Sequence, residues 1–383
     1  MEKQYLRCSK KIRIGIILNG ATPGDIAGGD VHILNLITAL SKKYDVCVII
    51  PYHKEMIERI NRNSKAEIIE MKDKYKFNKK EDLIKVYLYR AVKVYKILKK
   101  EKFDLVVTSC PFFCDVLPLL ALDKKTKVAC WIFHVLPKRK NPEVRDKILN
   151  LLTSLQEEIC FRIIKRKADL IFTCNNIEKQ KIFSRIRHSN IQIGYLGIDK
   201  EFIDKIKAKR KKDTAFFVGR MVRQKGIFDL VRIMKKITKK NRNFRLYMAG
   251  GGPEKQELEK EIKRKNLQNN VFVLGYVSDK ELFKKMKESE FFFFPSYEEG
   301  FGIVVAEALY CGNKVICYKL PHYKEFFGDF PEYVEIGNIK EFVEKINIDK
   351  DLKKQEKFAK EFDHRLRIKK DLAEIENLTR ELT

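Results

Sequence analysis

Long apolar runs are missing from this sequence of 383 residues. It contains no stretch of eighteen or more apolar residues, so we expect no helix that spans a membrane. The N-terminal segment MEKQYLRCSKKIRIGIIL places basic residues before an apolar run. That run is short, lacks a small-residue cleavage site and continues as an alternating segment. We therefore expect no signal peptide and a cytoplasmic chain.

A disulfide framework is also missing. The nine cysteines are scattered, and their odd number fits no framework spacing, which indicates buried thiols in a reducing compartment. Cys110 and Cys114 have no nearby cluster of His or Cys, so zinc is not expected. The D-x-D triplet Asp349-Lys350-Asp351 is far along the chain from the predicted strand ends, and we interpret it as a solvated connection. We therefore predict no metal ion and no other cofactor.

Common phosphate-binding and nucleic-acid-binding signatures are absent as well. The first strand is not followed by G-x-G-x-x-G, and no P-loop occurs anywhere in the chain. There is no zinc finger, RNP-type aromatic motif or helix-turn-helix pattern, so we predict no nucleic-acid partner. The net charge of +28, from 80 Lys and Arg against 52 Asp and Glu, needs another cause.

The densest basic segment is residues 72–102, with 12 basic and 4 acidic side chains. Tyr87, Ala91, Val94 and Leu98 recur in it at helical spacing among lysines. This pattern predicts a basic amphipathic helix that can lie on an anionic surface, such as the inner face of a membrane. The alternative is a helix whose apolar stripe faces the core and whose lysines face solvent.

What the sequence does contain is an alternation of short apolar strands with longer helical patterns. This alternation predicts parallel, doubly wound sheets. The pattern breaks at residues 197–212, which predicts two domains: residues 1–205, completed by a C-terminal helix at 356–383, and residues 206–355. Strands are expected at residues 12–18, 44–50, 105–107, 127–133, 170–173 and 191–196, and then at 216–218, 244–248, 271–274, 291–294 and 314–317.

The most informative stretch is residues 290–312, EFFFFPSYEEGFGIVVAEALYCG. It predicts a buried strand, an acidic loop, a glycine turn and a helix that begins near Ile303 and ends at Gly312. Free amides in the first turn of a helix bind anions. Glu299 and Glu307 frame this turn and would accept hydrogen bonds from hydroxyls, as a nucleotide sugar requires. The alternative is a solvated acidic loop before an ordinary helix.

A basic loop precedes that stretch in the same predicted domain. Arg220 and Lys225 follow one strand end and precede a helix, so they can reach the same crevice, because parallel strands end at one edge. There they would neutralise a diphosphate leaving group without a metal. The alternative is that Arg220 and Lys225 are ordinary solvent-exposed charges. In the first domain, Gly28-Gly29 precedes a helix expected at residues 31–40 and suits a phosphate or sugar, or simply makes a turn.

Taken in order, these motifs resemble glycosyltransferase family 4, whose members are retaining enzymes that use nucleotide sugars. The resemblance spans nearly the whole chain and is densest in residues 215–312. It implies the GT-B fold, in which two Rossmann-like, doubly wound parallel-sheet domains face an interdomain cleft. The motifs that carry it are Gly219-Arg220 with Lys225-Gly226, Ala249-Gly250-Gly251-Gly252-Pro253, Leu274-Gly275-Tyr276-Val277, and Pro295-Ser296 with the Glu299 and Glu307 pair.

The resemblance also implies residue roles. Glu307 would hold the ribose hydroxyls and Glu299 a hydroxyl of the transferred sugar, while Arg220 and Lys225 would bind the departing diphosphate. His134 would lie near the donor sugar, although a structural role is the alternative. The other implied donor and acceptor-side contacts are the amides around Gly300, Phe301 and Gly302, the base-framing residues Tyr276 and Val277, and the glycines Gly28, Gly29, Gly219 and Gly251.

The activity implied is transfer of a hexose or N-acetylhexosamine from a UDP- or GDP-sugar to a glycan or lipid-linked acceptor. Two alternatives remain: a GT-B relative with other chemistry, such as a nucleotide-sugar epimerase or a phosphorylase, and a basic module that binds membranes or nucleic acids. Some positions depart from the family pattern. Asn313-Lys314 stands where a small residue and proline are usual, and His364 stands where an aromatic residue is common.

Overall fold

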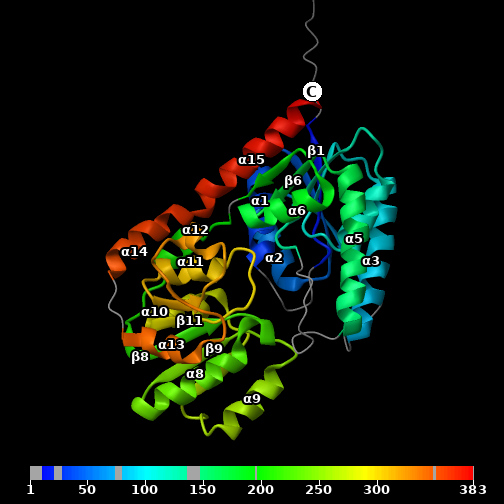
Figure 1. Cartoon of the computed structure of the whole chain (residues 1–383). Helices are drawn as coiled ribbons and strands as arrows, with labels where there is room; N and C mark the ends of the chain where they lie inside the picture. The colour runs from blue at the N-terminus through cyan, green and yellow to red at the C-terminus, as the bar shows by residue number, and fades with distance from the viewer. Residues whose placement is uncertain are drawn as a thin grey trace, which may run out of the picture. The chain divides into compact units, whose positions relative to one another are not determined.

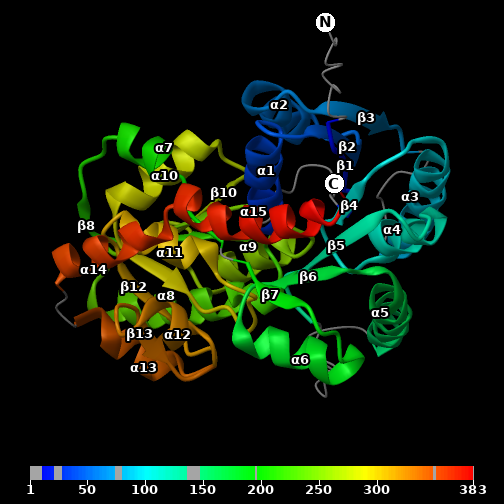
Figure 2. The same cartoon turned by 90° about the horizontal axis from the view of Figure 1, so that it is seen from above.

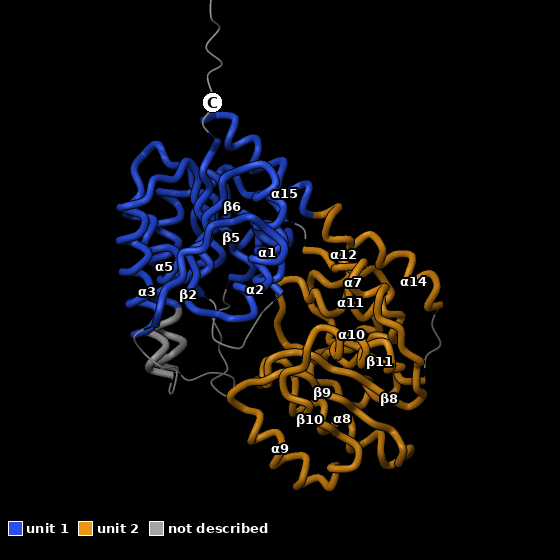
Figure 3. Tube along the Cα trace, turned by 180° about the vertical axis from the view of Figure 1, so that it is seen from behind, with its two compact units in different colours: residues 1–140, 146–195, 368–383 blue, residues 141–145, 196–367 orange. Residues whose placement is uncertain are grey.

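The computed structural model describes residues 11–20, 28–73, 80–135, 147–194, 196–347 and 351–382. The chain divides into two compact units, each built around its own parallel sheet (Figure 3). The second unit holds residues 196–367, and residues 368–383 return to the first unit. The two doubly wound parallel sheets predicted from the sequence are thus confirmed.

The first unit has a seven-stranded parallel sheet with the order β3-β2-β1-β4-β5-β6-β7. Its inner strands are short apolar runs rich in Val and Ile, buried on both faces as parallel sheets require. The strands are β1 (Arg13–Ile17), β2 (Asp45–Pro51), β3 (Glu67–Met71), β4 (Leu105–Thr108), β5 (Lys127–Ile132), β6 (Leu170–Thr173) and β7 (Ile191–Ile193).

Helices cover both faces of this sheet (Figures 1 and 2). One face packs against α1 (Gly28–Leu40), α2 (Lys54–Asn63) and α15 (His364–Arg380). The other packs against α3 (Lys80–Lys100), α5 (Lys147–Lys167) and the short segments between β4 and β5. Those segments are α4 (Phe113–Val116) and η1 (Leu117–Ala121), and α6 (Asn176–Ile186) joins β6 to β7.

The helix α15 is fastened to the first unit by polar contacts as well as apolar packing. His32 Nε2 on α1 lies 3.0 Å from a carboxylate oxygen of Asp371, and both side chains are buried. The His32 ring also packs edge-on against Trp131, with 4.5 Å between ring centroids. The Tyr44 hydroxyl hydrogen-bonds the Thr379 hydroxyl at 3.2 Å. These contacts hold the last part of α15 in the first unit.

The second unit has a six-stranded parallel sheet with the order β10-β9-β8-β11-β12-β13. Stacked phenylalanines fill its core: Phe217 packs on Phe294 and Phe244 on Phe293, with centroids 6.1 and 6.0 Å apart. The strands are β8 (Lys211–Val218), β9 (Arg245–Ala249), β10 (Val271–Gly275), β11 (Ser289–Phe294), β12 (Lys314–Tyr318) and β13 (Glu332–Val334).

Helices connect successive strands, which gives the parallel arrangement. The connecting segments are η3 (Arg223–Lys225), α8 (Ile227–Lys240), α9 (Lys255–Arg264), α10 (Asp279–Glu288), α11 (Ile303–Tyr310) and α12 (Tyr323–Phe327). Before β8 lies α7 (Lys200–Lys205), and after β13 lie α13 (Ile339–Glu344), η4 (Lys345–Asn347), α14 (Leu352–Ala359) and η5 (Lys360–Phe362).

Several element boundaries differ from the predictions. The strands β3 and β13 were missed, because each lies at a sheet edge and is too short or too polar to stand out in the sequence. The helix α1 begins at Gly28 rather than at residue 31. The predicted C-terminal helix at 356–383 is divided into α14, η5 and α15. It is interrupted at Asp363, which pairs with Ile198 as an isolated β-bridge.

The division between units also differs from the predicted boundary at residue 205. Residues 196–205 belong to the second unit because α7 is bonded to it. Lys287 Nζ donates to the carbonyl oxygens of Ile203 and Ile206 at 2.6 and 2.9 Å, and the Tyr310 hydroxyl donates to Asp204 at 2.8 Å. Of the D-x-D triplet, Asp349 and Lys350 lie outside the described residues, and Asp351 caps α14.

Candidate functional site

The strand order of the second unit reverses between β8 and β11, which are neighbours in the sheet. In parallel sheets, ligands bind beyond the carboxyl ends of the strands at such a reversal. Here β8 leads into the basic loop of residues 219–226, and β11 leads into the acidic loop and glycine turn of residues 295–302. The two motifs that the sequence analysis singled out separately are therefore adjacent in the fold.

Glycines hold the basic loop close to the ends of the neighbouring strands. Gly219 N–H donates to the carbonyl of Ala249 at 3.1 Å, and Met221 N–H donates to that of Gly251 at 2.7 Å. Gly250 has φ 121°, and a Cβ there would lie 2.1 Å from the carbonyl oxygen of Gly219. No other residue fits at this position, so the backbone approach itself requires glycine.

The basic loop is also bonded to the acidic loop. Tyr297 N–H donates to the carbonyl of Gln224 at 2.9 Å, and a Cβ on Gly226 would lie 2.0 Å from the carbonyl oxygen of Pro295. Lys225 Nζ donates to Glu299 Oε1, and the two side chains are only 19% and 13% exposed. Two residues assigned to one site from sequence thus form an ion pair in the protein.

Arg220 and Arg223 have different surroundings, although both lie in this loop. The Arg223 guanidinium is engaged by Glu254 and Glu257 and lies 4.4 Å from the Phe228 ring centroid. Arg220 is exposed, and its side chain has no hydrogen bond or ion pair with any described residue. The described part of the loop therefore presents Arg220, and part of Lys225, to an anion.

The glycine turn places an unblocked helix N-terminus beside these cations. Gly302 has φ 81° and occupies the N-cap position of α11, where no side chain caps the helix. The helix α8 likewise begins at Gly226 without a side-chain cap. The Phe301 ring is buried against Phe326, with centroids 4.8 Å apart, so only its backbone belongs to the turn. Uncapped first-turn amides are donors for an anion.

Glu307 lies one turn into α11 and is half-buried. Its carboxylate has no hydrogen bond or ion pair with the residues that the structure describes. Burial, together with the negative charge of Asp279, raises its pKa to about 8. A half-buried carboxylate with unused acceptors is suited to receive hydrogen bonds from a ligand's hydroxyl groups.

Tyr276 and Val277 follow β10 on the same edge of the second sheet. Tyr276 is 61% exposed, and its ring lies against Gly251, where a Cβ would be 2.3 Å from the ring. Val277 is half-buried. An exposed ring beside a bare glycine offers a flat surface on which a planar group can stack.

Gly28, Gly29 and His134 belong to the first unit, whereas the site residues described so far belong to the second. Gly28 and Gly29 form the first turn of α1, and a Cβ on Gly29 would lie 2.9 Å from the Phe133 ring. His134 Nδ1 lies 3.3 Å from Glu178 Oε1. Burial alone would raise the pKa of Glu178, but the bonds from His134, Lys181 and Val135 N–H hold it at about 2. His134 is thus anchored by a buried carboxylate.

Sequence reasoning missed a polar network that organises the second unit's site. Asp229 in the first turn of α8 is buried and accepts hydrogen bonds from the Tyr297 and Tyr318 hydroxyls at 2.5 and 2.7 Å. It therefore ties α8 and β12 to the acidic loop. Sequence reasoning also missed Tyr323 of α12, whose hydroxyl lies beside Gly302. Isolated tyrosines separated along the chain give no pattern by which the sequence could have identified them.

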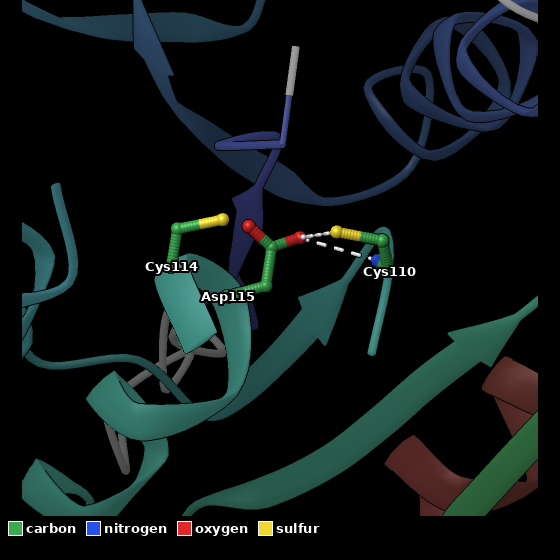
Figure 4. A group of neighbouring side chains, drawn as sticks. All are labelled: Cys110, Cys114 and Asp115. Atoms are coloured by element: carbon green, nitrogen blue, oxygen red, sulfur yellow. Dashed lines mark hydrogen bonds between the residues drawn. The ribbon is translucent and has the colours of Figure 1, made fainter. Parts of the chain in front are cut away.

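Among the described residues, three possible metal ligands are grouped in the first unit: Cys110, Cys114 and Asp115 (Figure 4). Sequence reasoning missed Asp115. Its carboxylate already accepts bonds from the backbone of Asn19, Ser109 and Cys110 and from the Ser109 hydroxyl. Burial raises the pKa of Asp115 to about 6 and raises the pKa of both thiols. The cluster therefore joins the ends of β1 and β4, and the expectation of no metal stays a prediction.

The basic segment 72–102 is helical from Lys80 to Lys100, while residues 74–79 lie outside the described part of the chain. Its apolar stripe does not face solvent: Ala91, Val94 and Leu98 are buried, the last two in the core of the first unit. Arg90 is also buried and is paired with Asp73. The predicted stripe is therefore a packing surface, as the alternative held.

The solvent face of α3 still combines charge with apolar area. Leu88 and Val92 are 43% and 55% exposed. The exposed lysines of this face are Lys85, Lys93, Lys96, Lys99 and Lys100. None of the helices in the described residues combines the length and apolar character needed to cross a bilayer.

Two family models match adjoining parts of the chain. Glycosyltransferase Family 4 matches residues 26–202, and Glycosyl transferases group 1 matches residues 199–366. A glycosyltransferase of Methanocaldococcus jannaschii, itself uncharacterized, is 31% identical over 244 residues, 60% of this chain and 59% of that protein. The N-acetylgalactosamine-N,N'-diacetylbacillosaminyl-diphospho-undecaprenol 4-alpha-N-acetylgalactosaminyltransferase of Campylobacter jejuni is 32% identical over 200 residues, 49% of this chain and 53% of that protein. The chain thus spans little more than half the length of these relatives.

Solved structures share the fold over nearly the whole chain. Anabaena HepE in complex with UDP and glucose has a TM-score of 0.70 at 18% identity and covers 96% of this chain and 99% of its own. Sucrose-phosphate synthase from Thermosynechococcus elongatus has a TM-score of 0.73 at 15% identity, with 97% and 99% covered. The chain therefore belongs to glycosyltransferase family 4, with the GT-B fold and a group 1 glycosyl transferase domain in its second unit.

Proposed function

We propose that the chain is a retaining glycosyltransferase that moves a hexose or N-acetylhexosamine from a nucleoside diphosphate sugar to an acceptor hydroxyl. The observation that carries the proposal is the arrangement at the β8 and β11 ends. There the Lys225–Glu299 pair and exposed Arg220 adjoin two uncapped helix N-termini, and half-buried Glu307 has unused acceptors. Cations and amides suit a diphosphate, and carboxylates suit sugar hydroxyls.

The proposed roles follow from the number of donors and acceptors at each group. An ammonium has three donors, so Lys225 can keep one bond to Glu299 and give another to the diphosphate. The second oxygen of Glu299 can then accept from a hydroxyl of the transferred sugar. Glu307 accepts from the ribose, and Tyr276 with Val277 frames the base. HepE, which shares the fold, was crystallised with UDP and glucose, and this supports the choice of ligand.

In the proposed transfer, the bond from the sugar's anomeric carbon to the phosphate oxygen breaks and a bond to the acceptor oxygen forms on the same face. The acceptor's proton passes to the departing phosphate oxygen, so no protein nucleophile takes part. Arg220 and Lys225 stabilise the negative charge that develops on the diphosphate. His134 is held by Glu178 in the first unit, and its role toward the donor sugar stays a prediction.

A panel of UDP-, GDP- and ADP-sugars tests the proposal directly. A ligand that binds only the folded state raises the melting temperature, so one sugar nucleotide should stabilise the chain. With an acceptor present, that compound should release free nucleoside diphosphate. No stabilisation by any member would contradict the proposal, and conversion of the sugar without an acceptor would indicate an epimerase instead.

Turnover is expected to survive EDTA, because Arg220 and Lys225 supply the positive charge at the leaving group. The measurement is the rate of nucleoside diphosphate release before and after chelation. Added Mg²⁺ should give no increase. Loss of turnover on chelation, restored by Mg²⁺ or Mn²⁺, would contradict leaving-group stabilisation by side chains alone.

The affinity for the sugar nucleotide is expected to rise with pH up to about 8. Ribose hydroxyls donate to the ionised form of Glu307, whose pKa in the free protein is about 8. Binding must therefore release a proton below this pH, and affinity falls by up to about tenfold per pH unit as the pH is lowered. Isothermal titration between pH 6 and 8 measures the slope, and Glu307→Gln should lose most of it.

The same pKa makes a prediction about stability. The folded-state pKa of Glu307 is raised above its ordinary value of 4.5, so folding favours the protonated form. The contribution of Glu307 to the free energy of unfolding is fully present below about pH 4.5 and is lost as the pH rises through about 8. The free energy of unfolding of wild type should fall over this window relative to Glu307→Gln. Parallel pH profiles for the two proteins would contradict the raised pKa.

A lipid-linked acceptor is the second part of the proposal. The Campylobacter relative is named for an acceptor carried on undecaprenyl diphosphate, and this supports an acceptor at a membrane surface. The exposed face of α3 offers lysines with Leu88 and Val92, a combination that adheres to anionic bilayers. We therefore propose peripheral contact through α3 on the inner face of the membrane.

A further inference from the structure

Tyr323, the first residue of α12, carries a hydroxyl that is buried and yet has no hydrogen-bond partner among the described residues. The side chain is 1% exposed, and its ring packs against His322 and Phe327 with centroids 5.1 and 5.3 Å away. Buried hydroxyls are almost always bonded, because leaving one unsatisfied is costly. Because the ligand-free protein keeps this unsatisfied hydroxyl, we expect the hydroxyl to form a hydrogen bond in the ligand-bound state.

The hydroxyl lies at the glycine turn before α11. A Cβ built on Gly302 would be 2.6 Å from the Tyr323 oxygen, so any side chain at position 302 would collide with it. Gly302 is also the uncapped N-cap of α11. The unpartnered hydroxyl therefore lies beside Gly302, where α11 begins, and the proposed function assigns the first-turn amides of this helix to the donor.

The nearby carboxylate of Glu299 indicates which part of the sugar nucleotide Tyr323 contacts, the sugar or the diphosphate. The phenol is protonated at neutral pH and can donate one hydrogen bond; burial first, and then the negative charge of Glu299, raises its pKa further. Glu299 is the carboxylate assigned to hydroxyls of the transferred sugar. Tyr323 and Glu299 thus adjoin the same turn, one as a neutral donor and the other as an acceptor.

We propose that the Tyr323 hydroxyl hydrogen-bonds an oxygen of the hexosyl group of the bound sugar nucleotide and so takes part in selecting the sugar. This inference rests on the proposed function. It goes beyond that function because it assigns a sugar-contacting residue to α12, in addition to the residues already proposed for the donor.

The test is Tyr323→Phe in the full chain, with calorimetric titration of UDP-glucose, GDP-mannose and ADP-glucose and of the matched probes UDP, GDP and ADP. For the sugar nucleotide that binds wild type, the affinities of that compound and of its matched nucleoside diphosphate are then measured in the variant. Affinity for the sugar nucleotide should fall about threefold to tenfold, as for loss of one neutral hydrogen bond, while affinity for the free diphosphate is unchanged. The melting temperature without ligand should hold or rise, because an unsatisfied hydroxyl has been removed.

Tyr333→Phe is the matched control. The Tyr333 hydroxyl lies 3.1 and 2.8 Å from the carbonyl oxygens of Tyr323 and Gly328 and shares its one hydrogen between them, so its loss should lower the melting temperature and leave sugar-nucleotide affinity unchanged. Unchanged sugar-nucleotide affinity in Tyr323→Phe overturns the inference, as does an equal loss of affinity for the free diphosphate. Failure of wild type to bind any member of the wider panel of UDP-, GDP- and ADP-sugars, N-acetylhexosamine donors included, would instead overturn the proposed function.

Discussion

Replacing Lys225 with alanine is expected to lower turnover by about 10²–10³-fold, the usual effect of removing one donor that stabilises developing negative charge. Lys225 is held at the glycine turn by Glu299 and by the packing of its loop on Pro295. The measurement is the rate of nucleoside diphosphate release at saturating donor.

Two variants of the same loop serve as comparisons. Arg220→Ala should also reduce turnover by orders of magnitude, and because Arg220 is exposed it should leave the melting temperature unchanged. Arg223→Ala should have little effect on turnover, since its guanidinium is directed to Glu254 and Glu257. Near-normal turnover in Lys225→Ala or Arg220→Ala would mean that the diphosphate is held elsewhere.

Replacing Lys93, Lys96, Lys99 and Lys100 together with glutamine is expected to weaken binding to anionic vesicles by several hundred-fold. Each lysine near an anionic surface contributes about 1 kcal/mol, and all four are exposed on α3. Cosedimentation with phosphatidylserine-containing vesicles measures the effect. Sugar-nucleotide binding should be unchanged, because the residues assigned to it in the second unit lie on other elements.

A charge-matched control distinguishes an effect of the α3 surface on vesicle binding from an effect of the net charge of the chain. Glutamine at Lys236, Lys239, Lys240 and Lys263 removes the same charge from exposed positions on α8 and α9. This variant should still cosediment with vesicles. If wild type ignores such vesicles at physiological salt, α3 is a solvated helix, and a soluble acceptor becomes the better proposal.

The strands and the glycine turns could be predicted because their signals are local. A run such as Phe291–Phe294 has no stable alternative to burial, and a turn with positive φ, as at Gly302, admits glycine far more readily than other residues. The edge strands β3 and β13 could not be predicted, because short strands with one neighbour need no continuous apolar run.

The basic helix illustrates the limit of periodicity. Helical spacing of Ala91, Val94 and Leu98 establishes an apolar stripe but not what covers it. Whether that stripe meets a membrane or a protein core depends on the neighbouring elements, and here η1 and α5 supply the core. The same limit applies to Arg90, which counts as a surface charge in the sequence and is buried against Asp73 in the fold.

The sequence alone determined the family motifs, the two parallel sheets and the residue types gathered for a diphosphate and its sugars. Only the tertiary structure decided that Lys225 pairs with Glu299, that Glu307 has no partner among the described residues, and that the Tyr323 hydroxyl lies against Gly302. The physical reason is distance along the chain. Propensities and turns depend on neighbours within a few residues, whereas partnerships between side chains depend on which strands adjoin, and that is settled when the sheet assembles.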